Sequence, residues 1–336
     1  MRGAPLIAAL TFLAAPLHPL GDLKAQDTHL LIVSGLGGDA QYSEQFVDWG
    51  LRMMDAAVAA GIDANRIHFL AEDPEAAPGK IRARSTREEI ERTIDEMSSA
   101  ATPEDRVFVL LIGHGGGSGP DSRVSIPGPS LRASEYALLL DRLAPRMTAL
   151  VNVASGSGDF IPTLASEGRI VVTATRSARQ RNAAIFGGYF VEAFEEGAAD
   201  VDRDARVSLL EAFEYARVET KRYYDDRGLL SSETALLEDR SNGSGSEEPL
   251  GEEGVGTLAT RFFLESLVPN VIAGDDEASE NLRALYSEQA RLEEAIARLG
   301  QRQEAMGPEE YRSALERLLV ELAQVGSEIR DLEATR

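Results

Sequence analysis

The sequence predicts an α/β domain with a mostly parallel sheet and helices on both faces, followed by a helical tail. Short apolar segments alternate with amphipathic ones between residues 29 and 177, and apolar residues recur at intervals of three and four after residue 279. Each short apolar segment is a nearly continuous run of Val, Ile and Leu, which is typical of parallel strands buried on both faces. The expected strands are 29–35, 67–71, 106–112, 148–154 and 169–175.

Helix patterns separate these strands and continue beyond the last one. They cover 43–60, 86–99, 133–144, 183–198 and 208–226. Strands and helices that alternate in this way predict a layered α/β domain, which we place at residues 27–240.

Residues 1–26 have the pattern of a secretory signal peptide. Met1 and Arg2 give a positively charged start, residues 6–17 are apolar apart from Thr11, and Ala25 offers a small residue for cleavage. The apolar run is too short for a membrane span, which argues against an uncleaved anchor. No later segment is apolar for long enough to cross a bilayer. We therefore expect a periplasmic or secreted protein with no membrane span in its mature chain.

The composition excludes several classes of function. The chain has no cysteine, so it has no disulfide, no thiolate metal site and no cysteine nucleophile. Its formal net charge is -22 and its pI is near 4.6, which repels phosphate backbones and argues against a nucleic-acid partner.

The composition changes after the α/β domain. Residues 241–278 begin with a polar, Gly/Ser-rich stretch, and they include a short apolar segment that we expect to pack back on the domain. Residues 279–336 predict a coiled-coil-like hairpin of two helices, 279–305 and 308–334, which meet at Gly307-Pro308. The apolar stripe of each helix needs a partner, so self-association through 279–336 is one possible outcome, and packing on the main domain is the other.

The candidate catalytic or binding residues lie at two strand ends. The third expected strand ends in Gly113-His114-Gly115, and the fourth ends in Ala154-Ser155-Gly156-Ser157-Gly158. Parallel strands deliver their carboxyl ends to one edge of the sheet, where ligands usually bind. Alone, His114 suits a loop and the serines suit turns. The glycine run lacks the Gly-Lys-Ser/Thr of a phosphate loop, and the Gly-x-Ser-x-Gly nucleophile elbow is absent too.

The order and spacing of these motifs resemble those of the legumain-like peptidases of the caspase clan. In that family one strand ends in His-Gly and the following one in Ala-Cys-x-Ser-Gly. The earlier Ser34-Gly35 and Tyr42 also fit, and the resemblance covers residues 27–240. It implies a caspase-like sheet in which His114 and Ser155 stand at the catalytic positions and Gly115 at the oxyanion hole.

Three departures from the family pattern affect the expected activity. Ser155 replaces the cysteine nucleophile, Gly37 stands where the family has an asparagine that orients the histidine, and Ser43-Glu44 stand where legumains have an Arg-His pair. A serine hydroxyl needs a base that a third group holds in the right tautomer. We therefore expect a pseudopeptidase that acts as a binding or scaffold module for a protein or peptide. The alternative is a hydrolase that uses a Ser155/His114 dyad.

A further pattern predicts weak calcium binding between the last two helix patterns. Oxygen ligands fall at positions 1, 3, 5, 7, 9 and 12 of an EF-hand-like loop: Asp200, Asp202, Asp204, the Arg206 carbonyl, Ser208 and Glu211. Ala205 replaces the glycine of position 6, which weakens binding by about tenfold. The alternative is structural, because Ser208 and Glu211 also form a capping box.

Overall fold

The computed structural model of the chain describes residues 26–145, 147–195, 199–201 and 206–264, parts of 281–299, and residues 306–334. The predicted signal peptide lies almost wholly outside the described residues. Within them, no helix is long and apolar enough to span a membrane.

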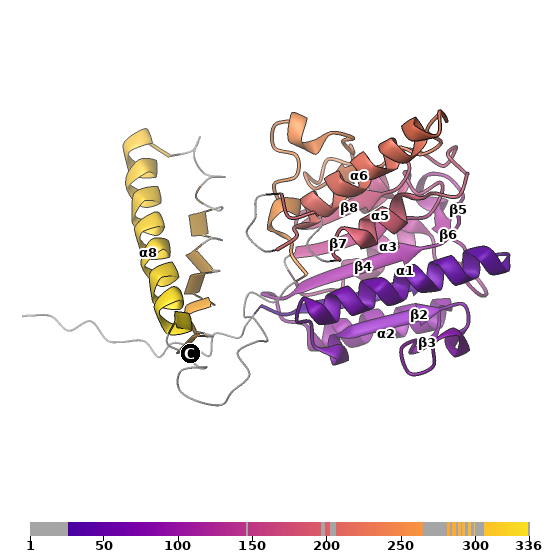
Figure 1. Cartoon of the computed structure of the whole chain (residues 1–336), viewed down its shortest axis with the longest axis horizontal. Coiled ribbons are helices and arrows are strands. Elements are labelled where there is room, and N and C mark those ends of the chain that lie inside the picture. The colour runs from indigo at the N-terminus through magenta and orange to yellow at the C-terminus, as the bar shows by residue number, and fades with distance from the viewer. Residues whose placement is uncertain are drawn as a thin grey trace, which may run out of the picture.

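A mixed, mostly parallel sheet forms the centre of the α/β domain (Figure 1). Seven strands of the described residues lie in the order β3-β2-β1-β4-β7-β8-β9, and β9 alone among them is antiparallel to its neighbour. They are β1 (Thr28–Ser34), β2 (Ile67–Ala71), β3 (Ala83–Arg84), β4 (Arg106–Ile112), β7 (Met147–Asn152), β8 (Arg169–Thr173) and β9 (Leu236–Glu238). The five predicted strands are confirmed, whereas the short strands β3 and β9 were not predicted.

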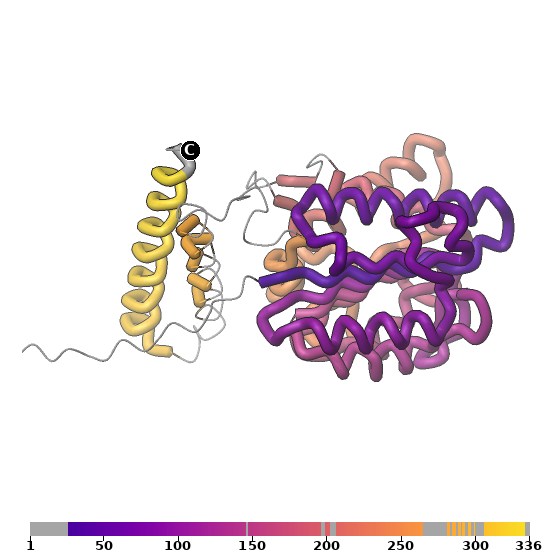
Figure 2. The backbone as a smooth tube through the Cα atoms, turned by 90° about the horizontal axis from the view of Figure 1, so that it is seen from below, coloured from indigo at the N-terminus to yellow at the C-terminus, as the bar shows by residue number. Residues whose placement is uncertain are grey.

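Helices cover both faces of the sheet, as predicted. One face packs on α1 (Ala40–Ala59), α5 (Phe186–Glu192) and α6 (Leu209–Asp226), and the other on α2 (Arg87–Ala100), α3 (Ala133–Leu140) and α4 (Phe160–Leu164). Figure 2 shows α1 and α2 on opposite sides of the sheet. Side chains along β1 alternate between the two layers, so Leu30 and Ile32 join the first core and Leu31 and Val33 the second. The α/β architecture is therefore confirmed.

Local capping sets the helix boundaries. The Asp39 carboxylate accepts a hydrogen bond from the Tyr42 N–H, so α1 begins at Ala40, three residues earlier than predicted. Pro145 disfavours helical backbone at the residue before it, and α3 ends at Leu140 rather than at 144. Helix α5 begins at Phe186, later than the predicted start at 183.

The described part of the segment 241–278 folds back on the domain. Ser246 exchanges two backbone hydrogen bonds with Leu237 of β9. The Asp239 carboxylate accepts three backbone N–H groups of residues 256–259. Phe262 then follows the 3₁₀ turn Ala259–Arg261 into the core, 5.9 Å from the ring of Phe108. Ala259, Phe262 and Leu264 thus belong to the core on this face of the sheet.

The chain enters and leaves the domain at the amino-terminal edge of the sheet. The backbone N–H of Arg106, the first residue of β4, donates to the Asp27 carbonyl at 2.8 Å. Its guanidinium donates to the Phe263 carbonyl at 3.3 Å. The long C-terminal helix is confirmed as α8 (Pro308–Ala334), whose Ile329 packs with Leu282. Only parts of the predicted helix 279–305 lie within the described residues.

Candidate functional site

The two strand-end motifs meet at the carboxyl-terminal edge of the sheet. Strands β4 and β7 are parallel neighbours, and the Val153 N–H donates to the Leu111 carbonyl at 2.9 Å just beyond their paired residues. The chain after each strand then converges, and the Gly115 N–H donates to the Ser155 hydroxyl oxygen at 3.3 Å. We call His114, Gly115, Ser155 and Gly156 the strand-end site.

Glycine is required where these two segments approach. A Cβ on Gly115 would lie 2.1 Å from the Ser155 carbonyl oxygen, well inside van der Waals contact. Gly156 has a φ of 64°, a left-handed conformation that favours glycine. The glycines of the motif therefore permit the backbone contact that holds the site together.

A short hairpin and a loop border the strand-end site. Strands β5 (Gly115–Gly116) and β6 (Arg123–Val124) form the hairpin. Ser125, after β6, donates to the His114 carbonyl and accepts from the Leu36 N–H, both at 2.8 Å. On the other side, the Gly156 N–H donates to the Gln180 carbonyl at 2.8 Å. Backbone hydrogen bonds thus hold the site from β1 on one side and from the loop after β8 on the other.

Aromatic rings position His114. Its imidazole centroid lies 4.7 Å from that of Tyr42, nearly perpendicular to it, and 5.1 Å from that of Phe46. Both rings belong to α1. The imidazole makes no hydrogen bond with any residue that the structure describes, so no carboxylate or carbonyl selects its tautomer.

The Ser155 hydroxyl is bonded to the backbone rather than to a base. Ser155 is 2% exposed, and its hydroxyl accepts from Gly115 as described. An activated serine needs two contacts, one from the hydroxyl to the imidazole and one from the imidazole to an orienting group. Neither hydrogen bond exists among the described residues.

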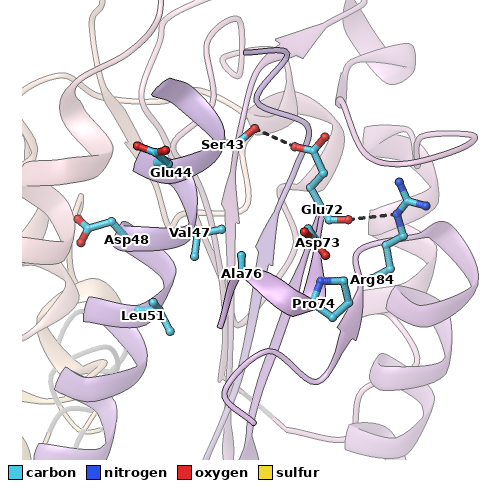
Figure 3. A pocket seen from close by; sticks show the side chains of 10 residues that line it. All are labelled: Ser43, Glu44, Val47, Asp48, Leu51, Glu72, Asp73, Pro74, Ala76 and Arg84. Carbon is cyan, nitrogen blue, oxygen red and sulfur yellow. Dashed lines mark hydrogen bonds between the residues drawn. The ribbon is translucent and has the colours of Figure 1, made fainter. Parts of the chain in front are cut away.

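Gly37 and Ser43 belong to one hydrogen-bond network around Glu72. The Gly37 N–H donates to the Glu72 carboxylate at 3.1 Å, and the Ser43 hydroxyl donates to the same oxygen at 3.1 Å (Figure 3). A Cβ at Gly37 would lie only 2.3 Å from the Ser43 nitrogen, so a larger residue does not fit there. Glu44 is exposed on α1. Sequence reasoning missed Glu72, although an acidic residue directly after a strand was the available signal.

Ser157 has a structural role in the same motif. Its hydroxyl lies 3.2 Å from the Thr175 hydroxyl and accepts the Thr175 N–H at 3.3 Å. The Thr175 hydroxyl in turn accepts the Gly158 N–H at 3.2 Å. These bonds join the segments that follow β7 and β8, which leaves Ser155 as the hydroxyl nearest to Gly115.

Glu233 is a buried carboxyl that fixes the loop after β8, and no motif in the sequence predicts this role. It accepts the Ile185 and Phe186 N–H groups at 3.0 and 3.1 Å, and the Tyr224 hydroxyl at 2.9 Å. Burial raises the pKa of Glu233, and the donated hydrogen bonds only partly oppose this. The beginning of α5 is therefore anchored close to the loop that contacts Gly156.

The predicted calcium loop is described only in part. Asp202 and Asp204 lie outside the described residues. One Glu211 oxygen accepts the Ser208 N–H and hydroxyl at 2.9 and 2.8 Å, and the other accepts the Val201 N–H at 3.0 Å. The guanidinium of Arg206 lies 3.6 Å from the centre of the Phe263 ring. The capping box is thus formed, and no group of three or more His, Asp or Glu gathers within the described ranges. Calcium binding stays a prediction.

Fold and site together define an α/β protein in which a histidine loop and a buried serine meet at one edge of a mostly parallel sheet. No family model and no curated protein matches the chain. Among solved structures it is similar to the crystal structure of protein GSU0716 from Geobacter sulfurreducens, a structural-genomics target. The TM-score is 0.42 and the identity 13%, over 63% of this chain and 92% of that one. At these values the likeness carries no argument about function.

Proposed function

We propose that the chain is an exported, legumain-like protein of the caspase clan that has lost peptidase activity and binds a protein or peptide segment. One observation carries the proposal: the Ser155 hydroxyl is bonded to the Gly115 N–H and not to the His114 imidazole. The order of the motifs along the chain supports the family, and the positions of His114 and Ser155 at adjacent strand ends agree with it.

The expected loss of activity is large. Removal of one member of a Ser-His-Asp triad slows a hydrolase by roughly 10⁴-fold for the orienting aspartate and roughly 10⁶-fold for the serine or histidine. Among the described residues, Ser155 has no contact with a base and His114 has no hydrogen-bonded orienting group. The strand-end site retains a backbone that hydrogen bonds hold in place from both sides. Such a site suits binding of a peptide better than bond cleavage.

Activity-based labelling tests the proposal directly. The mature protein should not react with a fluorophosphonate probe, which modifies activated serines, and should not cleave peptides after asparagine or aspartate. The Ser155→Cys variant should restore little cleavage, because the Gly37 and Ser43 network around Glu72 is unchanged. Strong asparaginyl cleavage by that variant would show that only the nucleophile had been lost.

A dyad hydrolase is the second candidate, favoured by the convergence of Ser155, Gly115 and His114 at one edge. In that case the probe should label the wild type, and labelling should disappear in both Ser155→Ala and His114→Ala. The Ser157→Ala variant is the matched control, since Ser157 bonds to Thr175 instead. Labelling that depends on Ser155 would replace the binding function with a catalytic one.

Export is part of the proposal and has its own test. Expression of the complete chain in a bacterial host, followed by cell fractionation and amino-terminal sequencing, should place a shortened protein outside the cytoplasm. A full-length chain retained in the cytoplasm would contradict it.

A further inference from the structure

A groove lies beside α1, outside the strand-end site. It has a volume of about 780 Å³ and runs between α1 and the connection from β2 to β3 (Figure 3). Apolar side chains line its middle: Val47 and Leu51 of α1, and Pro74 and Ala76 of the 3₁₀ turn Pro74–Ala76. Val47 and Ala76 stand between the two walls in Figure 3.

Carboxylates flank this apolar strip on both sides. Glu44 and Asp48 belong to α1, whereas Glu72 and Asp73 directly follow β2. Arg84 is the single cation among the lining residues, and its Nε donates to the Glu72 carbonyl at 3.1 Å. Four carboxylates and one guanidinium give the groove an excess of negative charge.

Two of these carboxylates, both on α1, have no strong partner among the described residues. Glu44 makes no hydrogen bond or ion pair with any described residue. Asp48 lies 3.7 Å from Arg52, but that guanidinium donates two shorter bonds, of 2.8 and 2.6 Å, to Glu195. Both Glu44 and Asp48 are exposed, so their charge is available to a ligand.

We propose that this groove binds the side chain of an arginine or lysine in a partner protein or peptide. The aliphatic stem of such a side chain packs on the apolar strip, and its cationic end reaches the carboxylates on either side. The charge is complementary, and the net charge of -22 steers a cationic partner to this protein. The groove is a second site, because its lining residues include none of the strand-end site.

A pair of matched peptides tests the proposal on the full chain. The probes are acetyl-Ala-Ala-Arg-Ala-Ala-amide and the same peptide with citrulline, which has nearly the shape of arginine but no charge. Methyl NMR of labelled protein should show the Val47 and Leu51 signals shifting with the arginine peptide and not with the citrulline peptide. Equal shifts with both peptides would overturn the proposal.

Charge-deletion variants distinguish binding in the groove from non-specific attraction to the acidic surface. Glu44→Gln with Asp48→Asn should weaken binding of the arginine peptide by about tenfold, as expected for two exposed charge contacts. The matched control is Glu88→Gln with Glu104→Gln, which removes two exposed charges outside the groove and should leave affinity unchanged. Equal losses in the two double variants would reduce the effect to non-specific attraction and refute the site.

Three further outcomes decide between occupants. Ser155→Ala should leave the peptide affinity unchanged, so failure of the peptidase-fold proposal and failure of the groove proposal can be told apart. Methyl shifts that depend on protein concentration without peptide would assign the groove to a second copy of the chain. Shifts of Val47 and Leu51 with millimolar calcium alone would assign it to a cation. Either result overturns the proposal.

Discussion

The contact between Gly115 and Ser155 makes a sharp test of how the strand-end site is built. In a Gly115→Ala variant the new Cβ would lie 2.1 Å from the Ser155 carbonyl oxygen and 3.4 Å from the Arg123 carbonyl oxygen. Relief of the first contact requires the two segments to separate by about 1.4 Å, since carbon and oxygen atoms are in contact near 3.5 Å. Gly116→Ala is the matched control, because a Cβ there meets no atom within 4 Å.

The expected magnitudes follow from these distances. Forced separation of packed segments costs about 1–3 kcal/mol, and loss of the Gly115–Ser155 hydrogen bond costs about 1 kcal/mol more. Alanine also reduces the conformational freedom of the unfolded chain, which stabilises the folded state of both variants by about 0.4–1 kcal/mol. We therefore expect Gly115→Ala to be destabilised by about 1–3 kcal/mol and Gly116→Ala to match the wild type or exceed it slightly. At about 2–4 °C per kcal/mol, the Gly115→Ala midpoint falls by roughly 2–12 °C.

Urea unfolding followed by tryptophan fluorescence measures the difference. The sole tryptophan, Trp49, is 5% exposed and packs in the core beside α5, so its emission reports on the α/β domain. Thermal melting by circular dichroism gives an independent midpoint. Equal stability of Gly115→Ala and Gly116→Ala would refute the close approach of the two strand ends, and with it the geometry on which the site rests.

Three more predictions concern other parts of the chain. Burial raises the pKa of Asp105, but His29, whose Nε2 lies 3.7 Å from the carboxylate, and hydrogen bonds from two backbone N–H groups outweigh burial and hold the pKa at about 2. Asp105→Asn should therefore lower stability by about 2 kcal/mol in urea titrations at neutral pH, and the deficit should shrink as pH falls from about 4 to 2; a constant deficit would exclude the ionised carboxylate as its source. Light scattering should give more chains per particle for the full protein than for a 27–272 truncation. If both proteins are monomers, this would argue against assembly through the tail. Calorimetry should detect calcium binding to the wild type at about 10⁻⁴–10⁻³ M and none to Asp200→Ala, and a flat wild-type titration would leave the loop as an acidic connector.

The sheet was predictable because its central strands are buried on both faces. Continuous runs of Val, Ile and Leu, such as the one in β4, identify a parallel strand without any knowledge of its neighbours. Strand β9 has three residues and pairs antiparallel at the edge, so its sequence has no periodicity to detect. Asp39 is a visible N-cap for α1, whereas the amphipathic pattern alone predicts a beginning at residue 43, three residues too late.

The candidate site was predictable only at the level of motifs. The convergence of two strand ends follows from parallel pairing, and Gly115 and Ser155 are in contact in the structure. The roles of Glu72 and Glu233 depend on contacts between residues more than 30 positions apart, which spacing along the chain does not reveal. The aromatic contacts of His114 likewise require the position of α1 relative to β4, which only the folded structure supplies.

Both connections of the α/β domain lie at the edge opposite the strand-end site, and this gives the molecule a functional polarity. Asp27 and Phe263 contact Arg106 where β4 begins, whereas Gly115 and Ser155 meet beyond the other end of the strand, about 23 Å away for seven residues. A copy held by either connection therefore presents its site outward. If chains join through residues 279–336, one assembly holds several such edges, and the gain is avidity for a multivalent partner.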